Sequence, residues 1–306
     1  MKIAIVGAGA MGSLFGSLLA EGGHEVWLYD IWQDHIQAVK QSGLQVERQG
    51  KTRNVRLNAA SDPTQIGESE LVLIFVKSTQ TQSAAESAAL LAGRNGWVLT
   101  LQNGMGNAET IAEYIPPNRI LAGTTAHGAT MLKAGSIRHA GVGPTTVGMW
   151  AGGEKEYQIA RKIADQFTQA AIESAAIEAI RPVIWDKLLV NVGINAITAL
   201  TGIKNGQILD LEVTRKLSRV AVEEAATVAR ARGIEIRKDP AAHVFQVAAA
   251  TAANRSSMGQ DVDQHRPTEI KAINGFVVRN AQSMGITAPV NQALTALVET
   301  MEAHYK

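Results

Sequence analysis

Short apolar runs alternate with helical segments through the first half of the chain. Lys2–Val6 and Glu25–Tyr29 have the pattern of strands, and the stretch between them, Met11–Ala20, has the pattern of a helix. Leu71–Val76 and Trp97–Leu101 are apolar throughout, which is typical of strands buried on both faces of a parallel sheet. This order predicts a doubly wound α/β domain.

The pattern changes twice further along the chain. Ile120–Gly123 is expected to be another strand, and the glycine-punctuated stretch Ala126–Met149 to be an antiparallel hairpin that extends the sheet. From about Lys155 strand patterns fade and helical periodicity takes over. We therefore expect an α/β domain over residues 1–178 and an all-α domain over residues 179–306.

Prolines near the starts and glycines past the ends delimit the helices of the second half. The expected helices are Arg181–Thr201, Glu212–Arg232, His243–Ala253, Pro267–Met284 and Pro289–Tyr305. These apolar helices would either complete the monomer or form a homodimer.

Composition narrows the class of protein. The 306 residues suggest two domains at roughly 100–200 residues each. With 29 basic and 28 acidic residues and no basic block, the chain lacks the electrostatic signature of nucleic-acid binding. We expect no window to reach the roughly 18 apolar residues that span a bilayer, and no signal peptide is expected at the start of the chain. We expect a cytoplasmic protein with no membrane partner. There is no cysteine and no paired-histidine spacing, so no metal site is expected.

The segment Gly7-Ala8-Gly9-Ala10-Met11-Gly12 matches G-x-G-x-x-G. It follows the first strand and opens a helix, which is the context of a Rossmann-type dinucleotide site. The first glycine permits a tight turn, the second lets a pyrophosphate approach the backbone, and the third allows close helix–strand packing. A glycine-rich turn without a ligand is the alternative.

Asp30 ends the second strand, 21 residues after Gly9. A carboxylate there accepts hydrogen bonds from the adenosine ribose, and Ile31–Ala38 contains no Arg or Lys for a 2′-phosphate. The residues therefore favour NADH over NADPH. The alternative for Asp30 is a turn or helix cap.

Two polar residues follow the ends of buried strands, where ligands bind in open α/β sheets. They are Lys77 and Asn103. Lys77 could instead extend to solvent, and Asn103, which precedes a glycine, could simply form a turn.

Three polar residues form a stripe on an otherwise apolar helix. Lys187, Asn191 and Asn195 recur at i, i+4 and i+8. A buried polar side chain without a partner costs about 1–3 kcal/mol, so the stripe indicates a polar ligand or a wet cleft. A stripe facing bulk solvent is the alternative.

A second polar set lies downstream. Asn254 and Ser257 share a face if their helix continues between them, and Glu269 falls in the first turn of the expected Pro267 helix. A glutamate in that position favours the helix dipole with or without a ligand.

These features together resemble the ketopantoate reductase (2-dehydropantoate 2-reductase) family over nearly the whole chain. The resemblance rests on Lys2–Gly12, on Gln102–Gly106, and on the spacing of Lys187, Asn191 and Asn195. It continues through Asn254–Met258 and from Thr268 to Gly275.

The resemblance implies NADPH-dependent reduction of a small-molecule 2-keto acid, ketopantoate, to D-pantoate. It implies that Lys187 is the general acid, and that Glu269 assists binding and catalysis. It also implies that Asn103, Asn191, Asn195, Asn254 and Ser257 hold substrate, with Asn103 and Lys77 close to the cofactor.

One position departs from the family pattern. Where the family usually carries an Arg for the NADP 2′-phosphate, this chain reads Leu28–Ile31. An NAD-dependent D-2-hydroxyacid dehydrogenase acting on branched 2-keto acids is therefore the alternative. A non-catalytic dinucleotide sensor is a third hypothesis, which the stripe at Lys187 disfavours.

Overall fold

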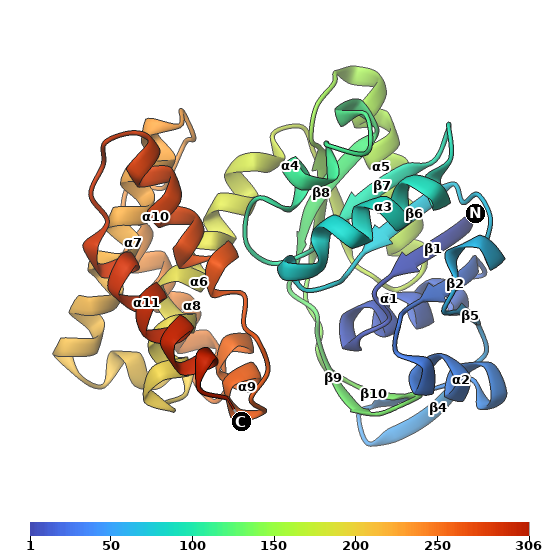
Figure 1. The fold of residues 1–306 in the computed structure, drawn as a ribbon, viewed down its shortest axis with the longest axis horizontal. Coiled ribbons are helices and arrows are strands. Elements are labelled where there is room, and N and C mark those ends of the chain that lie inside the picture. Colours follow the sequence, from blue (N-terminus) through green and yellow to red (C-terminus); the bar gives the residue numbers. More distant parts are fainter. Residues whose placement is uncertain (306) are drawn as a thin grey trace. The chain divides into compact units, whose positions relative to one another are not determined.

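A computed structural model describes residues 1–305, which separate into two compact units (Figure 1). The first unit comprises Met1–Gln102 and Asn107–Ile180, and the second comprises Asn103–Gly106 and the chain from Arg181 onward. The first unit is α/β and the second is helical, as the sequence patterns predict.

Strands and helices alternate along most of the first unit. Its strands are β1 (Lys2–Val6), β2 (Glu25–Tyr29), β3 (Leu44–Arg48), β4 (Lys51–Val55), β5 (Asn58–Ala60), β6 (Leu71–Ile74), β7 (Trp97–Thr100), β8 (Ile120–Thr125), β9 (Gly128–Lys133), β10 (Ser136–Gly141), β11 (Thr145–Met149) and β12 (Ser174–Ile177). Its α-helices are α1 (Ala10–Glu21), α2 (Gln33–Ser42), α3 (Thr81–Ala92), α4 (Asn107–Ile111) and α5 (Glu154–Gln169), with 3₁₀ turns η1 (Pro63–Gln65), η2 (Ser78–Gln80) and η3 (Pro117–Arg119).

The main sheet has eight strands in the order β12-β11-β8-β7-β6-β1-β2-β5. All neighbouring pairs are parallel except β8–β11. Alternate side chains of the central strands enter the cores on opposite faces of the sheet. In β1, Ile3 and Ile5 pack with α1 residues such as Leu14. Ala4 and Val6 belong to the apolar cluster on the other face, which includes Leu91 of α3. Covering both faces explains why these strands are apolar throughout.

The segment after β8 differs from its predicted arrangement. β9 and β10 form the expected antiparallel hairpin, but they lie in a separate sheet of order β4-β3-β10-β9, and β11 alone extends the main sheet. β10 pairs in parallel with β3, and buried Ile137 and Val46 join the core on the α1 side. Helix α1 contacts strands of both sheets. The apolar pattern also did not predict β3, β4, β5 or β12, and the four residues of β12 are mostly small.

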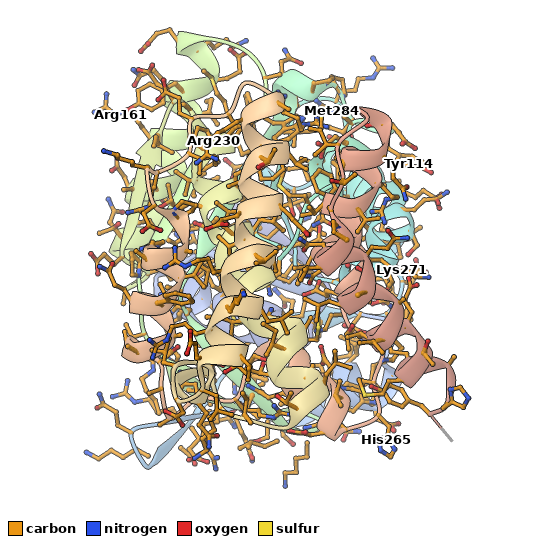
Figure 2. The ribbon with its side chains drawn as sticks, turned by 90° about the vertical axis from the view of Figure 1, so that its left-hand side faces the viewer. Tyr114, Arg161, Arg230, His265, Lys271 and Met284 are labelled. Carbon is orange, nitrogen blue, oxygen red and sulfur yellow. The ribbon has the colours of Figure 1, made fainter. Side chains whose placement is uncertain are left out.

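The second unit is built from helices around one apolar core. They are α6 (Ile180–Thr201), α7 (Glu212–Ala231), α8 (Pro240–Ala250), α9 (Ser257–Asp263), α10 (Asn274–Ser283) and α11 (Pro289–Ala303), with 3₁₀ turns η4 (Asn205–Leu209) and η5 (Ile270–Ala272). The core includes Trp185 and Val192 of α6, Ala225 of α7, Val277 of α10 and Val298 of α11. Arg230 of α7 and Lys271 of η5 lie at the surface of this unit (Figure 2).

Two predicted helices have different bounds in the structure. The helix expected over His243–Ala253 is α8, which ends at Ala250, and the one expected over Pro267–Met284 begins only at Asn274. Ile273 has φ −104° and ψ −96°, which is not helical, so the chain cannot run as one helix from Pro267.

Helix α6 contradicts the expectation that no segment is apolar enough to span a bilayer. By length and composition it is the one helix within residues 1–305 that is apolar enough to cross a bilayer, contrary to the expectation that no such window exists. Most of it is buried within the protein. Packing of Trp185, Leu188 and Val192 in the helical core accounts for its apolar composition.

Candidate active site

The three glycines of the loop after β1 have three different environments. Gly7 has φ +93°, and a Cβ on it would lie 2.8 Å from the Val76 backbone nitrogen. A Cβ on Gly12 would lie 1.9 Å from the Gly7 carbonyl oxygen. Gly9 is exposed, and a Cβ there would meet nothing within 4 Å. Gly7 and Gly12 are therefore required by the fold, whereas open space lies over Gly9, where a pyrophosphate would approach.

Helix α1 starts at this loop with the features of an anion site. Gly9 is its N-cap, no side chain caps it, and its first turn contains no acidic residue. The first N–H groups of the helix and the positive end of its dipole thus remain available for a phosphate. Ala10 and Met11 are partly exposed there, while Ala8 is buried.

The Asp30 carboxylate binds the loop directly. Ala8 N–H donates to Oδ2 over 2.7 Å and Trp32 N–H donates to Oδ1 over 2.9 Å. The second bond is the turn interaction that the sequence offered as an alternative. Because a carboxylate has about four acceptor positions, the two bonds leave room for ribose hydroxyls, so both roles are compatible.

The ends of β6 and β7 are tied together beside the loop. The Gln102 side-chain amide donates to the Val76 carbonyl and to Thr81 Oγ1, each over 2.9 Å. Lys77 directly follows Val76, is partly buried and precedes η2. The structure therefore brings Lys77 to the same sheet edge as Gly7, as expected from parallel strands.

Asn103 belongs by its contacts to the second unit, although the sequence placed it in the first domain. Met105 N–H donates to the Ala272 carbonyl over 2.9 Å, and a Cβ on Gly104 would lie 2.7 Å from that oxygen. Gly104 (φ +79°) and Gly106 (φ +94°) form the turn. The turn that follows Asn103 thus packs against the segment that carries Glu269, which no sequence pattern indicated.

Lys187 and Glu269 act on one another within the second unit. Burial lowers the pKa of Lys187 from 10.5 to about 8, and the Glu269 carboxylate partly opposes that shift by favouring the charged amine. Glu269 is only 6% exposed. A proton donor with a pKa near neutral pH, next to a buried carboxylate, suits general acid catalysis.

The rest of the polar stripe on α6 is also shielded. Asn191 is partly buried and Asn195 is 5% exposed. The stripe is therefore largely shielded from bulk solvent, which disfavours the alternative offered by the sequence.

Glu269 is not in the first turn of an α-helix, contrary to the sequence expectation. It precedes the short turn η5, and its side chain caps no backbone N–H. Thr268 N–H donates to Glu302 of α11 over 2.8 Å, which holds the segment. A favourable helix dipole therefore does not explain this buried carboxylate.

Asn254 and Ser257 do not share a helical face as expected. α8 ends before Asn254, which lies in a connecting segment, and Ser257 opens α9. Both are exposed. They nevertheless lie close in sequence to an anchored point, because Ser256 Oγ and Thr198 Oγ1 of α6 form a 2.6 Å hydrogen bond.

Arg255 and Asn205 hold this segment and were not selected from the sequence. Arg255 donates to the carbonyl of Ile203 over 2.9 Å, donates to the carbonyl of Thr198, and pairs with Asp263 over 2.8 Å. Asn205 N–H donates to the Asn254 carbonyl over 3.0 Å. Within residues 1–305, the buried Asn205 Oδ1 accepts no hydrogen bond. Arg255 and Asn205 lie outside the predicted helices, so no periodic pattern of polar residues indicated a role for them.

The Asn274 position has a structural role. Its side-chain amide donates to Asn291 Oδ1 over 3.0 Å, and Asn291 in turn donates to Glu224 Oε2 over 2.7 Å. This buried network joins α10, α11 and α7.

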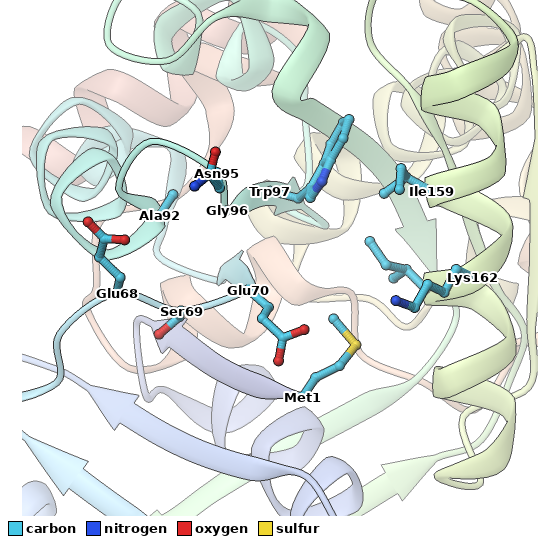
Figure 3. A pocket seen from close by; sticks show the side chains of 11 residues that line it. Met1, Glu68, Ser69, Glu70, Ala92, Asn95, Gly96, Trp97, Ile159 and Lys162 are labelled. Carbon is cyan, nitrogen blue, oxygen red and sulfur yellow. The ribbon is translucent and has the colours of Figure 1, made fainter.

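A cavity of about 320 Å³ lies elsewhere in the first unit (Figure 3). Met1, Glu70 and Trp97 line it, and these residues lie at the amino ends of β1, β6 and β7. The glycine loop follows the opposite end of β1, so this cavity is separate from the candidate site and contains none of its residues.

The first unit has the fold and loop of NAD(P)-binding oxidoreductases, and the second carries a lysine–glutamate pair with nearby amides. The family described as ketopantoate reductase PanE/ApbA matches residues 3–152, and its C-terminal part matches residues 179–302. The chain belongs to the ketopantoate reductase family.

Relatives cover the chain almost completely. The 2-dehydropantoate 2-reductase of Halobacterium salinarum is 38% identical over 97% of this chain and 98% of its own length. The enzyme of that name from Pyrococcus abyssi is 36% identical over 99% of this chain and 98% of its own length.

Solved structures share the fold. A PanE/ApbA family ketopantoate reductase from Ralstonia eutropha has a TM-score of 0.90 at 34% identity, covering 99% of both chains. A D-mandelate dehydrogenase in a ternary structure with NADH and anilino(oxo)acetate has a TM-score of 0.92 at 30% identity, also covering 99% of both chains.

Proposed function

We propose that the chain catalyses the reduction of ketopantoate (2-dehydropantoate) to D-pantoate by NAD(P)H, on the route to pantothenate and coenzyme A. The observation that carries the proposal is the Lys187–Glu269 pair, with a lysine pKa of about 8, in a member of the ketopantoate reductase family.

In this proposal, residues 7–12 and Asp30 hold the dinucleotide, with Lys77 near its nicotinamide end. The open space over Gly9 and the uncapped start of α1 fit a pyrophosphate. When bound, the reduced nicotinamide supplies the hydride that adds to the carbonyl carbon of the keto acid.

Lys187 has the central chemical role. The substrate carbonyl oxygen gains negative charge as the carbon is reduced, and the Lys187 ammonium stabilises that charge and donates the proton that completes the alcohol. Partial burial makes the amine more acidic than a free lysine, so the proton leaves more readily. The Glu269 carboxylate orients the amine and the substrate.

The amides provide substrate recognition. Asn103, Asn191, Asn195, Asn254 and Ser257 offer both donors and acceptors, which suit the carboxylate and hydroxyl groups of ketopantoate. Removing one such hydrogen bond should raise KM more than it lowers kcat if the bond is equally strong in the ground and transition states.

Asp30 leads us to propose NADH as the preferred reductant. A 2′-phosphate would lie near this carboxylate and meet no Lys or Arg in residues 31–38. The nearby His35 does not compensate, because it is 0% exposed and burial lowers its pKa.

A D-2-hydroxyacid dehydrogenase is the second candidate function. It is favoured by Asp30 and by the structural likeness to a D-mandelate dehydrogenase with NADH. Branched or aromatic 2-keto acids would then be the substrates.

One assay separates the two functions. NADH and NADPH oxidation would be followed with ketopantoate, 2-ketoisovalerate, 2-ketoisocaproate and benzoylformate. We expect the highest kcat/KM with ketopantoate. Inert ketopantoate beside a fast branched or aromatic keto acid would replace the first function with the second, and dinucleotide binding without turnover of any keto acid would indicate a sensor.

We also propose that the enzyme acts in the cytoplasm as a homodimer. Leu211 and Val213, 59% and 73% exposed at the start of α7, are apolar side chains that a second subunit could cover. Light scattering coupled to size-exclusion chromatography would test this, and a monomer at micromolar concentration would exclude it.

A further inference from the structure

A buried hydrogen-bond chain lies behind the glycine loop and ends on it at Ala8, while its other members lie outside the dinucleotide site. Its members are Gly135 in the β9–β10 turn, His35 of α2, Ser13 of α1 and Ala8 of the loop. His35 and Ser13 are both 0% exposed. No substrate or cofactor can therefore reach them directly.

The direction of each hydrogen bond follows from the donors available. Gly135 N–H donates to His35 Nδ1 over 3.0 Å, so that nitrogen carries no proton. Burial lowers the pKa of His35, and the neutral ring must then carry its proton on Nε2. Nε2 lies 3.2 Å from Ser13 Oγ, whose own proton goes to the Ala8 carbonyl over 2.8 Å.

Ala8 is thereby held on both sides. Its N–H donates to Asp30 and its C=O accepts from Ser13. Because the Ala8–Gly9 peptide is trans, its C=O and N–H point in opposite directions. A carbonyl directed at the buried Ser13 hydroxyl turns the Gly9 N–H away from Ser13, and a Cβ on Gly9 would meet nothing within 4 Å.

We propose that His35 and Ser13 are positioning residues for the dinucleotide. His35 orients the Ser13 hydroxyl so that it donates to the Ala8 carbonyl. That hydrogen bond fixes the Ala8–Gly9 peptide, whose N–H can then donate to the pyrophosphate. The turn containing Gly135 sets the His35 tautomer, so the small sheet takes part in cofactor binding. Gly135 has φ +71°, and a Cβ there would lie 2.8 Å from Ala38 Cβ, so a larger residue could not bring its N–H to the ring as easily.

The inference rests on the proposed dinucleotide binding, and a set of four variants tests it. His35→Gln can place an amide N–H₂ near the position of Nε2 and keep the bond to Ser13. His35→Asn can keep the bond from Gly135 but does not reach Ser13. Ser13→Ala removes the hydroxyl. Ser17→Ala is its matched control, because Ser17 is equally buried on α1 and, within residues 1–305, its hydroxyl bonds the carbonyl of Leu14 and no loop residue.

The NADH Kd, the apo-protein Tm, kcat and both KM values would be measured for the wild type and each variant. We expect Ser13→Ala and His35→Asn to raise the Kd and KM for NADH about tenfold, which corresponds to one lost buried hydrogen bond. kcat and the KM of the keto acid should stay near wild type. His35→Gln and Ser17→Ala should bind NADH within about threefold of wild type, on the same estimate.

Two results would overturn the inference while leaving the proposed function intact. One is wild-type NADH affinity in both Ser13→Ala and His35→Asn. The other is that His35→Asn and His35→Gln lose NADH affinity equally, each in proportion to its loss of apo Tm. That result would give His35 a purely structural role. A wild-type protein that binds neither NADH nor NADPH would instead refute the proposed function, and the inference with it.

Discussion

At the scale of single residues, Lys187 and Asp30 owe their properties to neighbours that the sequence does not place beside them. Lys187 lies partly buried on an apolar helix, near the carboxylate of Glu269. Asp30 accepts backbone hydrogen bonds from Ala8 and Trp32. In both cases the residue type was evident from the pattern, but its partner was not.

The pH dependence of the reaction should report Lys187. The amine must be protonated to act as the acid, and its pKa is about 8. The rate of keto acid reduction should therefore be constant below that pH and fall as pH rises through it, by about tenfold per unit. A profile of kcat/KM from pH 6 to 10 would check this, and a flat profile would remove Lys187 from the acid role.

Replacing the amine gives a second measurement of the same residue. Lys187→Ala should lower kcat by about 10²–10⁴ and leave the NADH Kd near wild type. Lys216→Ala, an exposed position on α7, is the matched control and should change neither. Turnover close to wild type in Lys187→Ala would contradict the assignment.

Cofactor preference should follow the charge at the end of β2. Asp30→Asn combined with Ile31→Arg keeps an acceptor for the Ala8 N–H, removes the negative charge and adds a partner for a 2′-phosphate. A charge-assisted hydrogen bond contributes about 1.5–3 kcal/mol, so the ratio of kcat/KM for NADPH over NADH should rise about 10- to 100-fold. A wild-type enzyme that already prefers NADPH strongly would show that Asp30 does not select the cofactor.

At the scale of secondary-structure elements, the turn between β1 and α1 and the connection between α8 and α9 position most of the candidate residues. The β1–α1 turn is determined by its own residues, because Gly7 and Gly12 leave no room for a side chain and Gly9 leaves space for a pyrophosphate. The second depends on Arg255, which donates to the carbonyl of Thr198 in the last turn of α6 and to that of Ile203 just after it, and which pairs with the carboxylate of Asp263.

The glycine loop predicts a clear contrast between two substitutions. Gly9 has φ −61° and no neighbour near its Cβ position, so Gly9→Ala should fold with a wild-type apo Tm. It should bind NADH at least about tenfold more weakly, because the added methyl group enters the space of the pyrophosphate. Gly12→Ala should destabilise the protein itself by about 2 kcal/mol or more, because its Cβ would collide with Gly7. Apo Tm and NADH titrations check both, and full NADH affinity in Gly9→Ala would argue against pyrophosphate binding at this loop.

Arg255 should affect the substrate more than the cofactor. Arg255→Ala removes an ion pair and two hydrogen bonds that hold the segment with Asn254 and Ser257. We expect a loss of about 1–3 kcal/mol of stability and a higher keto acid KM at an unchanged NADH KM. Arg230→Ala, exposed on α7 (Figure 2), controls for loss of a charge, and an equal effect there would exclude the anchoring role.

At the scale of the whole molecule, the two units are not consecutive stretches of sequence. Asn103–Gly106 comes from the middle of the α/β half, yet by its contacts it belongs to the helical unit. Met105 is 7% exposed and joins the same core as Trp185 and Ile270. The second unit is therefore completed by a segment from the first half of the chain.

Met105 gives a test of this organisation. Met105→Ala should lower the free energy of unfolding by about 2–5 kcal/mol, the usual cost of a cavity in a core. Met284→Ala, at a position 36% exposed, should cost far less. Equal, small effects in a denaturant titration would show that Met105 is not part of the helical core.

The sequence alone determined the features that depend on local rules. The apolar strands, the glycine loop and the bounds of helices such as α6 and α11 follow from backbone sterics and side-chain periodicity, and they lie close to where they were expected, whereas the predicted start at Pro267 was wrong. Short strands such as β12 and the break at Ile273 were missed, because small residues and a single non-helical φ/ψ pair leave no periodic pattern.

Only the tertiary structure decided which distant residues meet. It pairs Lys187 with Glu269, joins Met105 to Ala272, and links Gly135 through His35 and Ser13 to Ala8. These contacts depend on how helices and sheets pack, and burial then changes a pKa or fixes a tautomer. Packing is a non-local property of the folded chain. The candidate residues could therefore be selected from the sequence, but their partners could not be predicted from it.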